Sequence, residues 1–510
     1  MSRTASLHAL SNELLKDILE YVDSDPEKSV SIDRRAYLSV ESFRPPSPPL
    51  PSQAQDIGSF RLVCRKFGEL GIPHQFTRVA TRFSRTGFQR LDRICSHDHL
   101  TKHTRKFSYL IPYFYVQDKD RVRELLIDAN GDLHPLDAAS FRRKVDDQRD
   151  IIRSGEDLRV LKKAMAAFTS LQHVQILRLQ DEADRTLLDY LNENGDSASQ
   201  IVELRWTPAC IHATKTIGEA LVHGRSPFSR FSGPMMNPQS ALMIKDRTPP
   251  TVLSLAERLT CLELHFDDGA NLNDRMRELS PSFKRVFSAA SNMQAVHIGF
   301  PSRVPLDLRL EEIFHDVYWE KLRAFGIQAW RLEAEEVISL ARRHRKTLRG
   351  LRLRDVQLKE GGMWKDVLTM LRAEMEQLDW VSLRRVDYST HFDEMWANSM
   401  EVPDDPPDGS SDSDDEDDFA AHLSVGSGEE YSDGEDSDVH SDAGTDHGPE
   451  GYELALSPDT PATLPFCTCS RSSFPASADD LGDNGRFVLY PQRKVWEKWV
   501  VGRCPEHSAP

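Results

Sequence analysis

Short apolar segments that recur between residues 259 and 385 constrain the fold of this chain more than any other feature. The five segments share an L-x-x-L-x-L-like pattern, and they cover 259–266, 293–300, 322–329, 348–355 and 378–385. Steps of 34, 29, 26 and 30 residues separate their central positions, which are Leu262, Val296, Phe325, Leu351 and Val381. One strand with one helix cannot bury its own apolar face, so neighbouring units must stack.

Helical patterns fill the gaps between these strand-like segments, with apolar residues three or four apart. They lie at Ser282–Ala290, Glu311–Tyr318, Glu333–Arg345 and Met363–Met375. Strand-like segments also occur earlier, at 76–83, 105–111, 173–179 and 200–206, with a helical pattern at 87–95. The steps are near or just above the usual period of leucine-rich repeats. We therefore predict an α/β fold with a leucine-rich-repeat-like solenoid over residues 76–400.

The sequence leaves one alternative to the solenoid open, and part of the predicted solenoid does not follow the repeat pattern. The asparagine ladder of typical repeats is absent, which leaves open an ordinary α/β domain with right-handed crossovers. Residues 119–168 have a charged, helical pattern, whereas 207–257 contain WTP, GRSPFSRFSGPMMNP and RTPP, which are rich in turn and breaker residues. We expect loops from 207 to 257.

Two amphipathic segments precede the array. The stretch from Leu7 to Val22 carries one apolar stripe, with Ser11 as the expected N-cap. A second helix is expected to start at Asp56 and to stop at Gly71 and Pro73. Residues 23–55 form an insertion that includes the proline-rich PPSPPLP. By themselves these patterns indicate a helical hairpin over residues 1–75.

The residues of both segments resemble the F-box of fungal proteins, through LSNELLKDILEYV followed by FRLVCRKFGEL. The stretch RRHRKTLRGLRL is also similar to a late repeat of fungal F-box proteins with degenerate leucine-rich repeats. The resemblance implies the substrate-recognition subunit of a Skp-cullin-F-box ubiquitin ligase. Such a subunit binds a Skp-type adaptor, and through it a cullin, and holds an unknown protein substrate on its repeats.

On this resemblance, adaptor contact is expected from apolar residues of the two helices. They are Leu10, Leu14, Leu15, Ile18 and Leu19, with Val63 and Phe67 completing or supporting the surface. The receptor would perform no chemistry of its own and would need no cofactor. No nucleophile elbow, Walker motif or dinucleotide-binding glycine motif occurs in the chain. His97, His99 and His103 are interpreted as a surface cluster rather than a metal site.

The acidity of the chain belongs to one segment. Residues 401–450 hold 19 Asp and Glu and no Lys or Arg, whereas residues 1–400 carry 58 basic and 55 acidic groups, a balance of +3. We expect an intrinsically disordered acidic segment at 401–463 and no nucleic-acid partner. The segment indicates either a solubilising tail or a second function: a stand-alone repeat scaffold that binds basic proteins such as histones.

The last segment, 464–510, is expected to contain a strand at 486–490 and an aromatic stretch at 495–501. Cys467, Cys469, Cys504 and His507 could form a zinc site, but free thiols are the favoured interpretation. Seven sparse cysteines do not indicate a secreted disulfide framework. No run of 18 apolar residues predicts a membrane span, so we expect an intracellular protein, cytoplasmic or nuclear.

Overall fold

The computed structural model describes most of the chain outside the proline-rich and acidic segments. It covers residues 10–22, 51–112, 114–115, 135–179, 204–236, 254–266, 271–300, 304–397 and 477–502, together with Pro238 and Pro475. The acidic segment and the four candidate zinc ligands, Cys467, Cys469, Cys504 and His507, lie outside the described residues.

Three helices form the N-terminal part: α1 (Asn12–Val22), α2 (Pro51–Val63) and α3 (Arg65–Phe76). Helix α1 contacts both of the others, and Lys66 Nζ donates to the Leu10 carbonyl at 3.0 Å. The Ser11 cap is confirmed, because the Leu14 amide donates to Ser11 Oγ at 3.4 Å. The two helical segments therefore pack as one unit despite the long insertion between them.

The prediction of one helix from Asp56 to Gly71 is wrong. The helix starts earlier, is interrupted at Cys64, whose extended backbone has φ −164°, and continues past Gly71 and Pro73. Gly71 serves packing here, because a Cβ at this position would lie 2.4 Å from Arg61 Cγ. A glycine at a close approach between helices carries the same sequence signal as a helix stop.

Nine strands of the described residues form the continuous path of a sheet in which every neighbouring pair is parallel. Their order follows the chain: β1 (Arg78–Arg82), β2 (Lys106–Ile111), β4 (His173–Arg178), β6 (Arg230–Met236), β7 (Cys261–Phe266), β8 (Ala295–Gly299), β9 (Ala324–Leu332), β10 (Gly350–Leu358) and β11 (Trp380–Arg384). Strand β12 (Asp387–Tyr388) also pairs with β10. A separate antiparallel pair joins β3 (Phe114–Tyr115) and β5 (Leu204–Arg205).

The register of the sheet confirms the alignment of the apolar segments. The five central positions are direct partners on neighbouring strands: Leu262, Val296, Phe325, Leu351 and Val381. All five belong to the main hydrophobic core. Each step of 26 to 34 residues therefore spans one strand, one helical connection and two loops.

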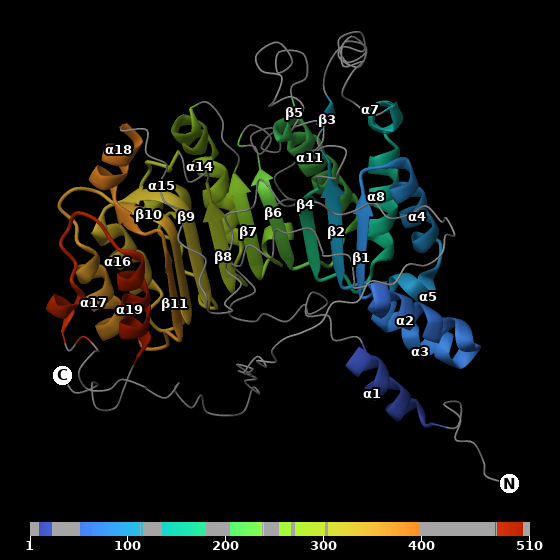
Figure 1. Cartoon of the computed structure of the whole chain (residues 1–510), viewed down its shortest axis with the longest axis horizontal. Helices are drawn as coiled ribbons and strands as arrows, with labels where there is room; N and C mark the ends of the chain where they lie inside the picture. The colour runs from blue at the N-terminus through green and yellow to red at the C-terminus, as the bar shows by residue number, and fades with distance from the viewer. Residues whose placement is uncertain are drawn as a thin grey trace, which may run out of the picture.

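Helices that connect the strands contact one another in succession, α4 with α8 and α8 with α11, and then α14 through α15 and α16 to α17. Their apolar faces and alternate strand residues share one core. The chain is thus an α/β structure with a mostly parallel sheet (Figure 1). These helices are α4 (Arg85–Cys95), α8 (Glu156–Ala167), α11 (Trp206–Gly224), α14 (Leu272–Ala289), α15 (Leu310–Phe314), α16 (Ala334–Arg343) and α17 (Trp364–Glu374).

The other helices for which the described part of the structure gives bounds lie around this arrangement. They are α5 (Asp98–Thr101), α7 (Pro135–Ser154), α18 (Ser389–Ala397) and α19 (Tyr490–Val501), with the 3-10 helix η4 (Ala478–Leu481). In Figure 1 the helices α1, α2 and α3 lie near the β1 end of the sheet, and α19 lies at the β11 end.

The loop prediction for 207–257 is wrong between Trp206 and Met236, where α11 and β6 form. Pro208 falls in the first turn of α11, where its missing N–H has no helical partner to lose. Pro234 falls where the β6 register shifts, between Gly233 and Met236, and such an irregularity tolerates proline. The strand predicted at 200–206 contributes only β5, which lies outside the parallel sheet.

Helix α19 covers the last strand of the sheet. The strand predicted at 486–490 is wrong, because Pro491 in the first turn starts this helix instead. Trp496 is fully buried, and its indole N–H donates to the Leu481 carbonyl at 3.0 Å. The Glu497 carboxylate accepts from the Leu383 amide on the free edge of β11. This contact occupies a backbone amide at an edge that could otherwise pair with a strand of another molecule.

We expect Trp496→Ala to destabilise the protein by about 3–5 kcal/mol, because it removes a fully buried aromatic side chain from the β11 end of the core. Urea denaturation followed by circular dichroism measures this free energy of unfolding. Val495→Ala, at an exposed position of the same helix, serves as the control and should change it by less than about 1 kcal/mol. Equal effects of the two substitutions would contradict the assigned packing of α19.

Candidate functional site

Five large apolar side chains are exposed on the N-terminal helices, and we call them the N-terminal patch. Helix α1 contributes Leu14, Ile18 and Tyr21, which are 51%, 39% and 87% exposed. Helix α2 contributes Leu62 and Val63, which are 87% and 56% exposed. Positions 14, 18 and 21 lie on one face of α1, since they are four and three residues apart. Three exposed apolar groups on one face of a helix, with two more on a helix that contacts it, indicate a surface that another molecule covers.

The structure divides the predicted adaptor-contact residues into two groups. Leu14, Ile18 and Val63 lie in the N-terminal patch, and Leu10 is half-buried. Leu15, Leu19 and Phe67 are buried, and the Phe67 ring stacks on Phe60 with centroids 4.4 Å apart. These three side chains therefore hold the helices together, and a partner cannot contact them in this arrangement.

Sequence reasoning missed Tyr21 and Leu62 as members of the N-terminal patch. Tyr21 lies seven residues after Leu14, so helical spacing could have identified it. Leu62 directly precedes Val63, and both lie at the end of α2, just before the interruption at Cys64 that the sequence did not predict.

The sheet face opposite the helices contains a buried polar network rather than an open surface. His173 Nε2 lies 2.9 Å from Ser232 Oγ, and Ser232 in turn donates to the Glu263 carboxylate. Arg230 contacts Glu263 at 3.4 Å. Burial raises the pKa of Glu263, although Arg230 and Ser232 oppose this shift, and burial lowers the pKa of His173 well below its usual range. The network satisfies polar groups on three neighbouring strands, so we interpret it as structural.

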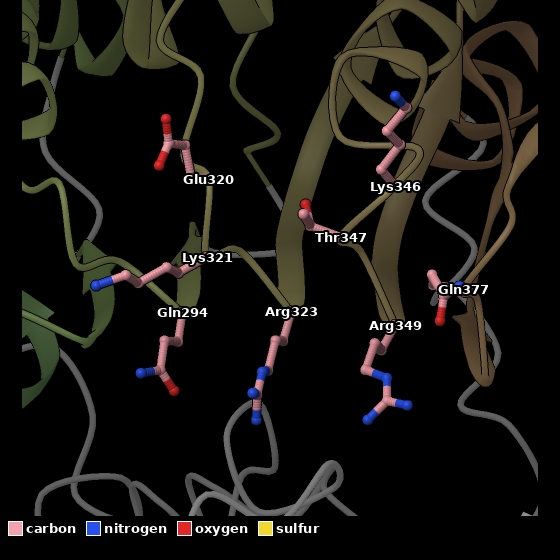
Figure 2. A pocket seen from close by; sticks show the side chains of 8 residues that line it. All are labelled: Gln294, Glu320, Lys321, Arg323, Lys346, Thr347, Arg349 and Gln377. Atoms are coloured by element: carbon pink, nitrogen blue, oxygen red, sulfur yellow. The ribbon is translucent and has the colours of Figure 1, made fainter.

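A second candidate site is a pocket of about 330 Å³ where β9 and β10 begin, which we call the basic pocket (Figure 2). Its lining residues come from loops that connect helices to strands. They are Gln294, Glu320, Lys321, Arg323, Lys346, Thr347, Arg349 and Gln377. Four cationic side chains and one carboxylate line it, and all five of these residues are exposed to solvent.

Two of the four cations already have partners. Arg349 pairs with Asp379 at 3.3 Å, and Lys321 Nζ donates to Asn292 at 2.6 Å. Arg323 and Lys346 make no side-chain ion pair with any residue that the structure describes. The basic pocket therefore has an excess of positive charge, which suits an anionic ligand.

His344 supports the rim of the basic pocket. Its carbonyl accepts the amides of Thr347 at 3.0 Å and Leu348 at 2.9 Å, and its ring stacks on Tyr318 and Trp319. Burial, with a smaller contribution from the Arg343 charge, lowers the pKa of His344 to about 4. A neutral imidazole therefore belongs to the folded state near pH 7.

Two of the histidines considered in the sequence lie side by side in the structure. The rings of His97 and His99 lie with centroids 5.7 Å apart, and within the described residues no cluster of His, Cys, Asp and Glu is suited to hold a metal. Among the helices that the structure describes, none combines the length and apolar composition that a membrane span requires.

No protein-family model matches the chain, and no curated protein is significantly similar to it.

We expect the fold to lose stability through His344 as the pH falls. A pKa lowered in the folded state gives stability that is present above the unfolded value of 6.5 and is lost as the pH falls toward 4. Preferential protonation of His344 in the unfolded state should by itself lower the free energy of unfolding by about 2 kcal/mol between pH 7 and pH 5. Urea denaturation at both pH values measures this loss, and His344→Phe should reduce it by about that amount.

The matched control for this experiment is His223→Phe, which replaces an exposed histidine on α11. The loss of unfolding free energy between pH 7 and pH 5 should be smaller in His344→Phe than in this control. Equal losses in the two variants would refute burial of a neutral His344.

Proposed function

We propose that the chain is an F-box substrate receptor: its N-terminal helices bind the Skp-type adaptor of a Skp-cullin-F-box ubiquitin ligase, and its remaining α/β part presents a protein substrate. The N-terminal patch carries this proposal. Helix α1 buries Leu15 and Leu19 and exposes Leu14 and Ile18, so it has one apolar face more than its own fold needs. The resemblance to the F-box, carried by α1 and by residues 60–70 at the junction of α2 and α3, supplies the identity of the partner.

The free energy of burying the exposed apolar groups supports a partner on this surface. Burying one large aliphatic side chain contributes about 1.5–3 kcal/mol, so four such groups in contact with a partner give a substantial part of a micromolar affinity. These groups are Leu14, Ile18, Leu62 and Val63. Association costs of several kcal/mol oppose this gain, and therefore the whole N-terminal patch is needed.

The arrangement of the strands and their connecting helices supports the second half of the proposal. The parallel strands follow the chain order, and their connecting helices contact one another in succession, as expected of stacked strand-helix units. We infer a leucine-rich-repeat-like array with α1, α2 and α3 at its first strand and α19 at its last. Such a scaffold needs no catalytic group, because holding a substrate near a ubiquitin-conjugating enzyme raises its effective concentration.

We expect the double variant Leu14→Asp, Ile18→Asp to reduce adaptor binding at least 100-fold, because it places two charges in the proposed apolar interface. Co-purification of the full chain with a recombinant Skp-type adaptor, followed by calorimetric titration, measures the binding. Both positions are exposed, so the variant should keep the circular dichroism spectrum of the wild type.

The control variant Ile152→Asp, Val304→Asp places the same charges at apolar positions that are exposed to a similar extent elsewhere. It should bind the adaptor as the wild type does. Equal adaptor binding by the Leu14 and Ile18 variant and the wild type, or no binding by the wild type, would refute the receptor function.

A further inference from the structure

The basic pocket is separate from the N-terminal patch, and the proposed adaptor contact makes no use of it. We propose that it binds an acidic peptide segment, whose Asp or Glu carboxylates pair with Arg323 and Lys346. This inference goes beyond the proposed function and holds whether or not the chain binds an adaptor.

The register of the sheet places two of the arginines side by side. Arg323 and Arg349 directly precede Ala324 and Gly350, which are partners on β9 and β10, and the Arg349 amide donates to the Arg323 carbonyl at 2.7 Å. Neighbouring strands lie about 4.8 Å apart, so the two guanidinium groups leave the backbone at nearly that spacing. Figure 2 shows both side chains projecting in the same direction from the strand starts.

Neighbouring cations repel each other unless an anion lies between them. Asp379, which directly precedes β11, neutralises Arg349, whereas Arg323 has no carboxylate partner among the residues that the structure describes. Lys346 is in the same situation on the loop after α16. A carboxylate ligand would complete for Arg323 the arrangement that Asp379 provides for Arg349.

The neutral lining residues fit a peptide. Gln294, Gln377 and Thr347 offer amide and hydroxyl groups that can bond a peptide backbone. The charged lining residues are exposed, so the basic pocket holds a chain that crosses its surface rather than a small molecule enclosed within it. Glu320 is the one carboxylate of the lining, and it disfavours acidic groups at its own side.

The distribution of charge favours a short acidic peptide over a nucleic acid. Residues 1–400 carry a balance of only +3, so the net charge of this part of the chain adds little attraction for a long polyanion. The cations of the basic pocket come from the loops before two neighbouring strands, which matches a few successive acidic residues. Because exposed ion pairs are individually weak, we expect a dissociation constant on the order of 0.1 mM at low salt.

Fluorescence anisotropy with a labelled octa-aspartate peptide tests this site, without adaptor. The protein is a full-length variant in which the 19 Asp and Glu of residues 401–450 are replaced by Asn and Gln, so that this segment cannot compete. Arg323→Ser, Lys346→Ser in that background should weaken binding at least tenfold. Raising the salt from 50 to 500 mM should weaken the binding as well.

The matched control is Lys284→Ser, Arg285→Ser, which removes two exposed cations from α14 outside the basic pocket. It should change the affinity less than twofold. The proposal is overturned if the peptide does not bind, if both double variants weaken binding equally, or if a single-stranded oligonucleotide of eight phosphates binds more tightly than the peptide. Loss of adaptor binding in the earlier experiment would leave this result unaffected.

Discussion

In-register parallel pairing of the strands is the constraint on which the other features of this structure depend. The pairing extends one residue beyond the strands. The amides of Arg323, Arg349 and Asp379 each donate to a backbone carbonyl on the neighbouring strand's side, and the residue with that carbonyl comes directly before the neighbouring strand. It directs one side of every strand into a shared core with the helices and brings the strand starts together in one row. The charge of the basic pocket therefore follows from which residues precede β9, β10 and β11.

The N-terminal helices join this core at one end, where Phe76 of α3 packs against it. Helix α3 contacts α5 and ends where β1 begins, so Leu15, Leu19 and Phe67 pack inside a small helical unit at the β1 end of the sheet. A unit of this size leaves part of its apolar surface exposed. The proposed adaptor contact uses this exposed part, and the distance along the sheet separates it from the basic pocket.

Features that repeat along the chain could be predicted from the sequence, because a periodic apolar pattern remains recognisable even where one repeat is irregular. The positions from Leu262 to Val381 were aligned correctly, and the Ser11 cap was found. Features that depend on tertiary contacts were missed. Pro234 occupies a register shift and Gly71 a close helix contact, yet each carries the sequence signal of a breaker. The basic pocket was also missed, since Arg323 and Arg349 become neighbours only through the strand register.

Hydrogen–deuterium exchange of the full chain, with and without a saturating Skp-type adaptor, tests the receptor function most directly. The amides of α1, α2 and α3 are expected to gain protection, because a bound partner suppresses local opening of these helices. The strands from β7 to β11 should exchange as in the free chain. Unchanged exchange in α1, α2 and α3, or protection confined to the sheet, would contradict the assignment of the N-terminal patch as the adaptor-binding surface.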